Sequence, residues 1–118
     1  MIMTGGELLS RFRQNHLSQQ QLADQVGCSR SMIAQAEQGM RQPSSKLLVA
    51  LSQALQLSDV ERAMLFLAHG RVEPDQESML PYIVAALRLD GCLLPNQAEA
   101  LIDLAVQEYE AVRQVHKL

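Results

Sequence analysis

The chain has 118 residues, a length that suits one compact domain or a small domain with an appendage. Its composition is 47% hydrophobic but only 3% aromatic, which favours an all-helical protein with a real core. The formal net charge of −3 argues against a polyanionic partner for the chain as a whole. However, residues 1–56 carry a balance of +2 and residues 57–118 one of −5. This asymmetry places any nucleic-acid partner on the first half and another role on the second.

Signals of secretion, metal binding or catalysis are weak. Cys28 and Cys92 lie in separate segments without CxxC spacing, which indicates buried thiols in a reducing cytoplasm rather than a disulfide or a zinc site. The start MIMTGGELL does not have the pattern of a signal peptide, and no apolar run has the length of a membrane span. His16, His69 and His116 have no partners at ligand spacing, and no phosphate loop or nucleophile motif is found. We therefore expect no enzyme, no cofactor and no metal site.

The first predicted element is a helix over residues 5–16. Its inward side chains are expected to be Leu8, Leu9 and Phe12, and its outward ones Arg11 and Arg13.

A second helix is predicted over residues 18–26. Ser18 and Gln21 have the spacing of a capping box, in which each side chain accepts a hydrogen bond from the other residue's backbone N–H. Gly27 suits the left-handed backbone that ends a helix. The apolar stripe of this helix consists of Leu22, Ala23 and Val26.

A third helix is predicted over residues 29–38, with Ser29 as its N-cap, Ile33 and Ala36 on its apolar side, and Gly39 at its end. Two short helices joined by a glycine-containing turn form a helix-turn-helix, whose second helix can lie in the major groove of DNA. The outward side chains are Arg30, Ser31, Gln35 and, on the flank, Gln38. Arg pairs with guanine and Gln with adenine in the major groove, so this face suits base readout, although an ordinary solvated face has a similar composition.

Two more helices complete the first half. The loop 39–43 places Arg41 where it can contact a phosphate. A fourth helix begins at Ser44 or Ser45, and a fifth runs from a capping box of Ser58 and Glu61 to about residue 69, where Gly70 ends it. The expected apolar residues are Leu47, Leu48, Leu51, Ala54 and Leu55 in the fourth helix, and Val60, Met64 and Leu67 in the fifth.

The segment from about residue 8 to 67 resembles the lambda-repressor-like, Cro-type family of helix-turn-helix regulators, also called the xenobiotic response element family. The matching residues are Arg11 or Arg13, Leu17, Ser18, Gln19, Leu22, Ala23, Val26, Gly27, Ser29, Ile33, Glu37, Gly39, Pro43, Leu47 and Leu51. The resemblance implies a five-helix, all-α DNA-binding domain, which we place at residues 1–70. It also implies that Gln19 contacts the DNA backbone and that Arg30, Ser31 and Gln35 contact bases. The full predicted contact set is Gln19, Ser29, Arg30, Ser31, Gln35, Gln38 and Arg41.

Ala36 departs from the family pattern, in which a large apolar or aromatic residue is usual at this position. We expect Phe66 or Met64 to fill the core beneath the third helix instead.

Residues 71–118 are predicted to form a two-helix extension. An acidic linker covers residues 72–78, and Pro81 suits the first turn of a helix that runs to about residue 89 and stops at Gly91. Its apolar residues are Ile83, Val84 and Leu87. A last helix begins at Pro95 or Asn96, with Asn96 and Glu99 as a cap pair, and continues to the end of the sequence.

The last helix has a long apolar stripe, formed by Leu101, Ile102, Ala105, Val106, Tyr109, Val112 and Val115. It either folds back on the fourth and fifth helices or pairs with a second copy. We favour the dimer, because Cro-type proteins commonly bind two half-sites with two-fold symmetry. The predicted dimerisation set is Leu101, Ile102, Ala105, Val106, Tyr109 and Val112.

The predicted function is a cytoplasmic, homodimeric repressor that binds the major groove of double-stranded DNA at a near-palindromic operator. One alternative is an antitoxin-type protein, as some relatives of this family are, which binds a protein partner through the C-terminal helices. Another is an adaptor that has lost DNA binding, against which the presence of Gln19, Arg30 and Gln35 counts.

Overall fold

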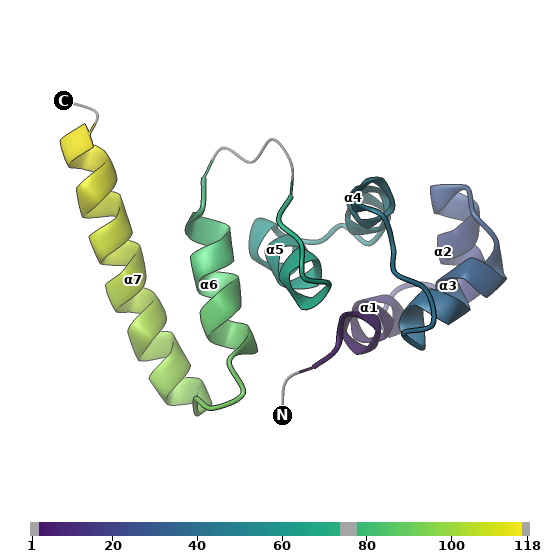
Figure 1. Ribbon diagram of the computed structural model, residues 1–118, viewed down its shortest axis with the longest axis horizontal. Coiled ribbons are helices and arrows are strands. Elements are labelled where there is room, and N and C mark those ends of the chain that lie inside the picture. The colour runs from purple at the N-terminus through teal and green to yellow at the C-terminus, as the bar shows by residue number, and fades with distance from the viewer. Residues whose placement is uncertain (1–2, 74–77, 117–118) are drawn as a thin grey trace.

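The computed structural model describes residues 3–73 and 78–116, and within these ranges the chain is all-helical, as the sequence predicts (Figure 1). The helices are α1 (Gly5–Gln14), α2 (Gln19–Val26), α3 (Arg30–Glu37), α4 (Ser45–Ala54), α5 (Asp59–Ala68), α6 (Leu80–Leu89) and α7 (Pro95–His116). The predicted linker residues 74–77 and the side chains of Val115 and His116 lie outside the described part. Among the described helices, none is long and apolar enough to cross a membrane.

Short polar side chains start the first five helices. Each accepts a hydrogen bond from the backbone N–H three residues ahead, which satisfies one of the donors that a helix N-terminus leaves free. The capping residues are Thr4, Ser18, Ser29, Ser44 and Ser58. The predicted capping boxes at Ser18 and Ser58 are confirmed, and the choice between Ser44 and Ser45 falls on Ser44.

The core lies among α1 to α5, and Tyr82 and Ala85 of α6 also belong to it. Its fully buried large side chains include Leu9, Leu22, Ile33, Leu48, Leu51, Leu65 and Phe66. Phe66 and Ala36 belong to the same apolar cluster, whereas Met64 is only partly buried beside it. Of the two predicted candidates, only Phe66 is fully buried in that cluster.

The predicted inward face of α5 is wrong in phase. Val60, Met64 and Leu67 are half-buried, and the buried residues of this helix are Ala63, Leu65 and Phe66. The reason is that α5 packs against α1 and α4 and also against α6, so its most buried side is set by tertiary contacts.

The two C-terminal helices extend the molecule to one side (Figure 1). α6 packs against α5 through buried Tyr82, Val84 and Ala85, and α7 packs against α6 rather than on α4 or α5. The hydroxyl of Tyr109 in α7 accepts a hydrogen bond of 3.2 Å from the backbone N–H of Met79, at the start of α6. This bond fixes α7 beside the N-terminus of α6.

The predicted end of α1 and the predicted cap pair of α7 are wrong, whereas the predicted start of α7 at Pro95 is confirmed. α1 stops at Gln14, two residues before the predicted end. α7 begins at Pro95, so Gln97 occupies the position from which a side chain can reach back, and its Oε1 accepts from the backbone N–H of Leu94 at 3.1 Å. Asn96 and Glu99 consequently form no cap pair.

Candidate nucleic-acid interface

The α2–turn–α3 unit has the local geometry that the sequence predicts. Ser18 Oγ accepts from the backbone N–H of Gln21 at 3.1 Å, and Gln21 Oε1 accepts from the backbone N–H of Ser18 at 2.9 Å. Gly27 ends α2 with φ +77°, a left-handed conformation in which a side chain is strained. Ser29 Oγ then accepts from Met32 N at 3.1 Å and starts α3. These contacts fix the angle at which α3 leaves the turn.

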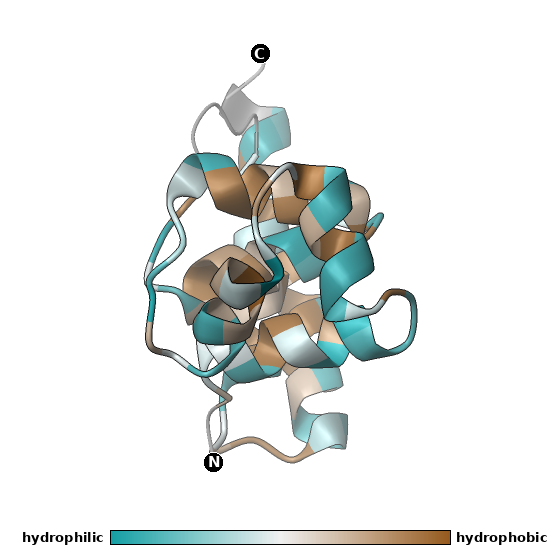
Figure 2. Cartoon of the chain, turned by 90° about the vertical axis from the view of Figure 1, so that its right-hand side faces the viewer, coloured by the Kyte–Doolittle hydropathy of each residue, from teal (hydrophilic) through white to brown (hydrophobic). Residues whose placement is uncertain are grey.

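α3 buries one side and exposes the other. Ile33 and Ala36 are buried, as predicted, which anchors the helix against the core. The exposed predicted contacts are Ser29, Arg30, Ser31, Gln38 and Arg41. Figure 2 looks at the molecule from the side where α2 and α3 lie, where hydrophilic and hydrophobic segments alternate along the helices. Because its other side is buried in the core, α3 is firmly held, and its N-terminal end presents a polar face to solvent.

Gln35 is joined to the loop that follows α3. It is half-buried, and its Oε1 accepts a hydrogen bond of 3.3 Å from Nε of Arg41. The bond leaves the two terminal nitrogens of the guanidinium and the amide NH₂ of Gln35 as donors. A residue predicted to contact bases and one predicted to contact phosphate thus lie within hydrogen-bond distance of each other.

Gln19 belongs to a hydrogen-bond network that crosses three helices. Its Nε2 donates to Oε1 of Glu37 in α3 at 3.2 Å. Glu37 in turn accepts from Nε and Nη2 of Arg13 in α1, at 2.5 and 3.0 Å. Nη1 of Arg13 donates to the backbone carbonyl of Leu17 at 3.2 Å. The pair of Arg13 and Glu37 is bidentate and charge-assisted, which makes its hydrogen bonds strong. Together with the bond from Gln19, it connects the start of α2 and the end of α3 to α1.

The prediction that Arg13 faces outward is wrong. Its side chain is only 13% exposed and that of Glu37 is 7% exposed, whereas Arg11 is exposed as predicted. The periodicity of α1 placed both arginines on the polar side because the partner of Arg13 lies 24 residues away. Both Arg13 and Glu37 are among the positions that match the Cro-type pattern, and this was the available signal for the pair.

Part of the predicted dimerisation set is already used within the chain. Ile102 is buried, Ala105, Val106 and Tyr109 are half-buried, and the hydroxyl of Tyr109 is bonded at the start of α6. Leu101 and Val112 remain exposed.

Comparison with known proteins agrees with this geometry. The helix-turn-helix family matches residues 9–61, which run from within α1 to the start of α5. Two proteins of Mycobacterium tuberculosis, from strains CDC 1551 / Oshkosh and H37Rv, are each 29% identical over 100 residues. The similarity covers 85% of this chain and 67% of each relative, and both relatives are named as uncharacterized HTH-type transcriptional regulators. No solved structure matches the chain significantly.

Proposed function

We propose that the chain is a Cro/C1-type DNA-binding transcriptional regulator, and specifically a homodimeric repressor that binds a near-palindromic operator through α3. The match of residues 9–61 to the helix-turn-helix family and the similarity to two HTH-type transcriptional regulators support this proposal. The observation that carries this proposal is the exposed polar N-terminal face of α3 on a helix whose other side is anchored by Ile33 and Ala36.

Base contacts are assigned to Arg30, Ser31 and Gln35. Arg30 and Ser31 lie in the first turn of α3, the part of a recognition helix that contacts base edges, with Ser29 at the cap. A guanidinium there can donate two hydrogen bonds to guanine, and the amide of Gln35 can pair with adenine.

Phosphate contacts are assigned to Gln19 and Arg41, with Gln38 on the flank. The amide of Gln19 has two hydrogens and gives one to Glu37, so the other is free to donate to a phosphate oxygen. Arg41 is exposed in the loop after α3, and its terminal nitrogens are not used by Gln35. Such contacts fix the position of the protein on DNA, while the base contacts select the sequence.

The dimer is assigned to the outer face of α7. Four apolar side chains on and beside this helix stay 41–61% exposed although α7 already packs against α6: Leu94, Leu101, Leu104 and Val112. Leu94, Leu101 and Leu104 follow the seven- and three-residue steps by which paired helices bury a common seam. A second copy of α7 would cover them and would bring two recognition helices together for two half-sites.

The base-reading role is tested with Arg30→Ala, with Arg11→Ala as the matched control because it removes the same charge from an exposed site outside the proposed interface. An operator is first selected from a random DNA pool. We expect Arg30→Ala to weaken binding to it by ~1–3 kcal/mol and to relax preference at one base pair. An equal loss on selected and random DNA would refute base reading by Arg30.

The dimer is tested by sedimentation of Leu104→Glu. Gln114→Glu is the control, since this exposed position shares its side of α7 with Asp103 and Glu110. We expect a monomer for the first variant and a dimer for the second. If the unmodified protein is itself a monomer that sediments as a complex only with another protein, the antitoxin-type alternative replaces the repressor dimer, because the same outer face of α7 would then hold that partner.

A further inference from the structure

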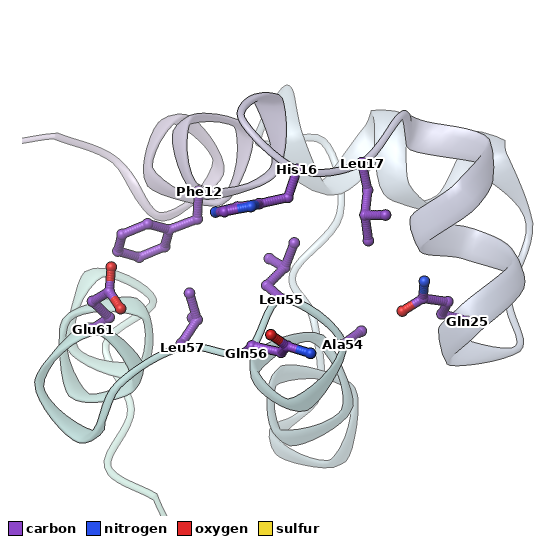
Figure 3. A pocket seen from close by; sticks show the side chains of 9 residues that line it. All are labelled: Phe12, His16, Leu17, Gln25, Ala54, Leu55, Gln56, Leu57 and Glu61. Atoms are coloured by element: carbon purple, nitrogen blue, oxygen red, sulfur yellow. The ribbon is translucent and has the colours of Figure 1, made fainter.

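A cavity of about 330 Å³ opens between the end of α1 and the α4–α5 turn, with α2 closing one side (Figure 3). Its lining residues are Phe12, His16, Leu17, Gln25, Ala54, Leu55, Gln56, Leu57 and Glu61. None of them is a proposed DNA contact, so the cavity and the DNA interface use different residues.

Apolar side chains form the body of the cavity. Leu55 is buried, and Phe12, Leu17 and Leu57 are half-buried and border the open space. In Figure 3 the ring of Phe12 lies above the carboxylate of Glu61, while Leu55 and Leu57 rise from the α4–α5 turn opposite. An aromatic ring beside a carboxylate is a combination that favours a cation, because both the ring face and the carboxylate attract positive charge.

Three helices end at this cavity. His16 and Leu17 follow the C-cap of α1, Asn15, while Gln25 is in the last turn of α2 and Ala54 is the last residue of α4. The C-terminus of a helix carries a partial negative charge from its free carbonyl groups. The positive N-terminal end of α5 is offset by Asp59 and Glu61 in its first turn. The helix ends and Glu61 therefore bring negative charge to the cavity, whose lining also includes the imidazole of His16.

Gln56 is held at the cavity by an unusual backbone conformation. It has φ +54°, in the left-handed region where glycine is the common residue after a helix. The turn is secured by hydrogen bonds from Gln56 N to Gln53 O at 3.1 Å and from Leu57 N to Ser52 O at 3.0 Å. A glutamine at this position places an amide at the cavity at a cost in backbone strain, and such strain is concentrated at binding sites.

We propose that this cavity binds a small organic cation, an amine that carries an aromatic or branched aliphatic group. The ammonium lies near Glu61 and the ring of Phe12 at one end of the cavity, and the apolar group extends past Leu57 and Leu55 toward Leu17 at the other end (Figure 3). The volume suits a ligand of about the size of phenethylamine, at the small end of ligand pockets.

The experiment is a titration of the isotopically labelled protein, without DNA, followed by the backbone amide signals of residues 16–17, 25 and 54–57. The probes are phenethylamine, the neutral 2-phenylethanol and the anionic phenylacetate. We expect phenethylamine to shift these signals with a Kd of about 1 mM, the alcohol to bind about fivefold more weakly, and phenylacetate not to bind. Because DNA is absent, failure of this proposal and failure of the proposed function are distinguishable.

The variant that tests the charge is Glu61→Gln, which keeps an oxygen for the capping bond to Ser58 N and so preserves the start of α5. Glu7→Gln is the matched control, because Glu7 occupies the same position in the capping box of α1 and does not line the cavity. We expect about fivefold weaker binding of phenethylamine by the first variant and unchanged binding by the second. Equal binding of amine and alcohol, equal binding by both variants, or shifts confined to other residues would each overturn the proposal.

Discussion

Glu37→Gln tests whether the hydrogen-bond network between α1 and α3 holds α3 in place. The carboxylate of Glu37 accepts two hydrogen bonds from Arg13 and one from Gln19, and its side chain is 7% exposed. The amide keeps the shape of the side chain but removes its charge, and one of its two terminal atoms becomes a donor that faces a donor. The guanidinium of Arg13 is then left largely buried without a counter-charge.

The expected cost follows from this burial. Breaking a buried ion pair by neutralising one partner costs roughly 3–5 kcal/mol. Arg13 retains 13% exposure and its bond to the carbonyl of Leu17, both of which soften the loss. We therefore expect a loss of unfolding free energy at the lower end of this range, about 3 kcal/mol. For a chain of this size, that loss lowers the melting temperature by about 10–15 °C.

The assay is reversible urea unfolding, with Glu99→Gln as the control. Glu99 pairs with Arg88 at 3.6 Å, with side chains 60% and 43% exposed, so its neutralisation should cost no more than about 0.5 kcal/mol. Glu37→Gln should also weaken binding to all duplexes, since Gln19 and Arg13 then share the single acceptor oxygen that the amide keeps, and Gln19 is held less firmly. If the two variants unfold at the same urea concentration, the Arg13–Glu37 pair is not what ties α3 to α1.

Two further results are expected. Gly27→Ala should lower the free energy of unfolding by about 1 kcal/mol, because φ is +77° but no atom lies within 4 Å of the added Cβ. Gly6→Ala should lower it by about 3 kcal/mol, because the added Cβ would lie 2.7 Å from the carbonyl oxygen of Ala36. Urea unfolding measures both losses of stability, and a larger loss for Gly27→Ala than for Gly6→Ala would contradict this prediction. The prediction that both thiols are buried is wrong for Cys92, which is exposed. In thiol titration with a disulfide reagent, Cys92 should react before Cys28, since partial burial raises the pKa of the Cys28 thiol and so favours its protonated form. Equal rates for the two thiols at pH 8 would show that this burial does not protect Cys28.

What the sequence predicted well depends on neighbours in the chain. The capping pairs of Ser18 and Ser58 lie within three residues of their partners, and Gly27 needs only its own backbone to end α2. These signals gave the helix starts and the turn, and the spacing of Ile33 and Ala36 gave the buried side of α3. Once the buried side of α3 is identified, the remaining polar residues are predicted to form its exposed face.

What the sequence missed depends on contacts between distant residues. Arg13 has the spacing of a surface residue, and only the folded chain brings Glu37 beside it. The buried side of α5 was misassigned because α6, which begins twelve residues after α5 ends, covers part of it. The sequence gives no sign of the cavity at Glu61 for the same reason, because four separate segments of the chain build it.

α7 shows how far periodicity can go on its own. The spacing of apolar residues in the sequence predicts an apolar face on α7, but this face is wider than α6 can cover. Ala98, Ile102 and Tyr109 lie on the side that the chain itself uses, and Leu101 and Leu104 lie on the outer side, with the two sides roughly 110° apart around the axis. A second copy can therefore pair with the outer side while α6 keeps the inner one. For this reason a charge at Leu104 tests association, whereas one at Ile102 would test folding.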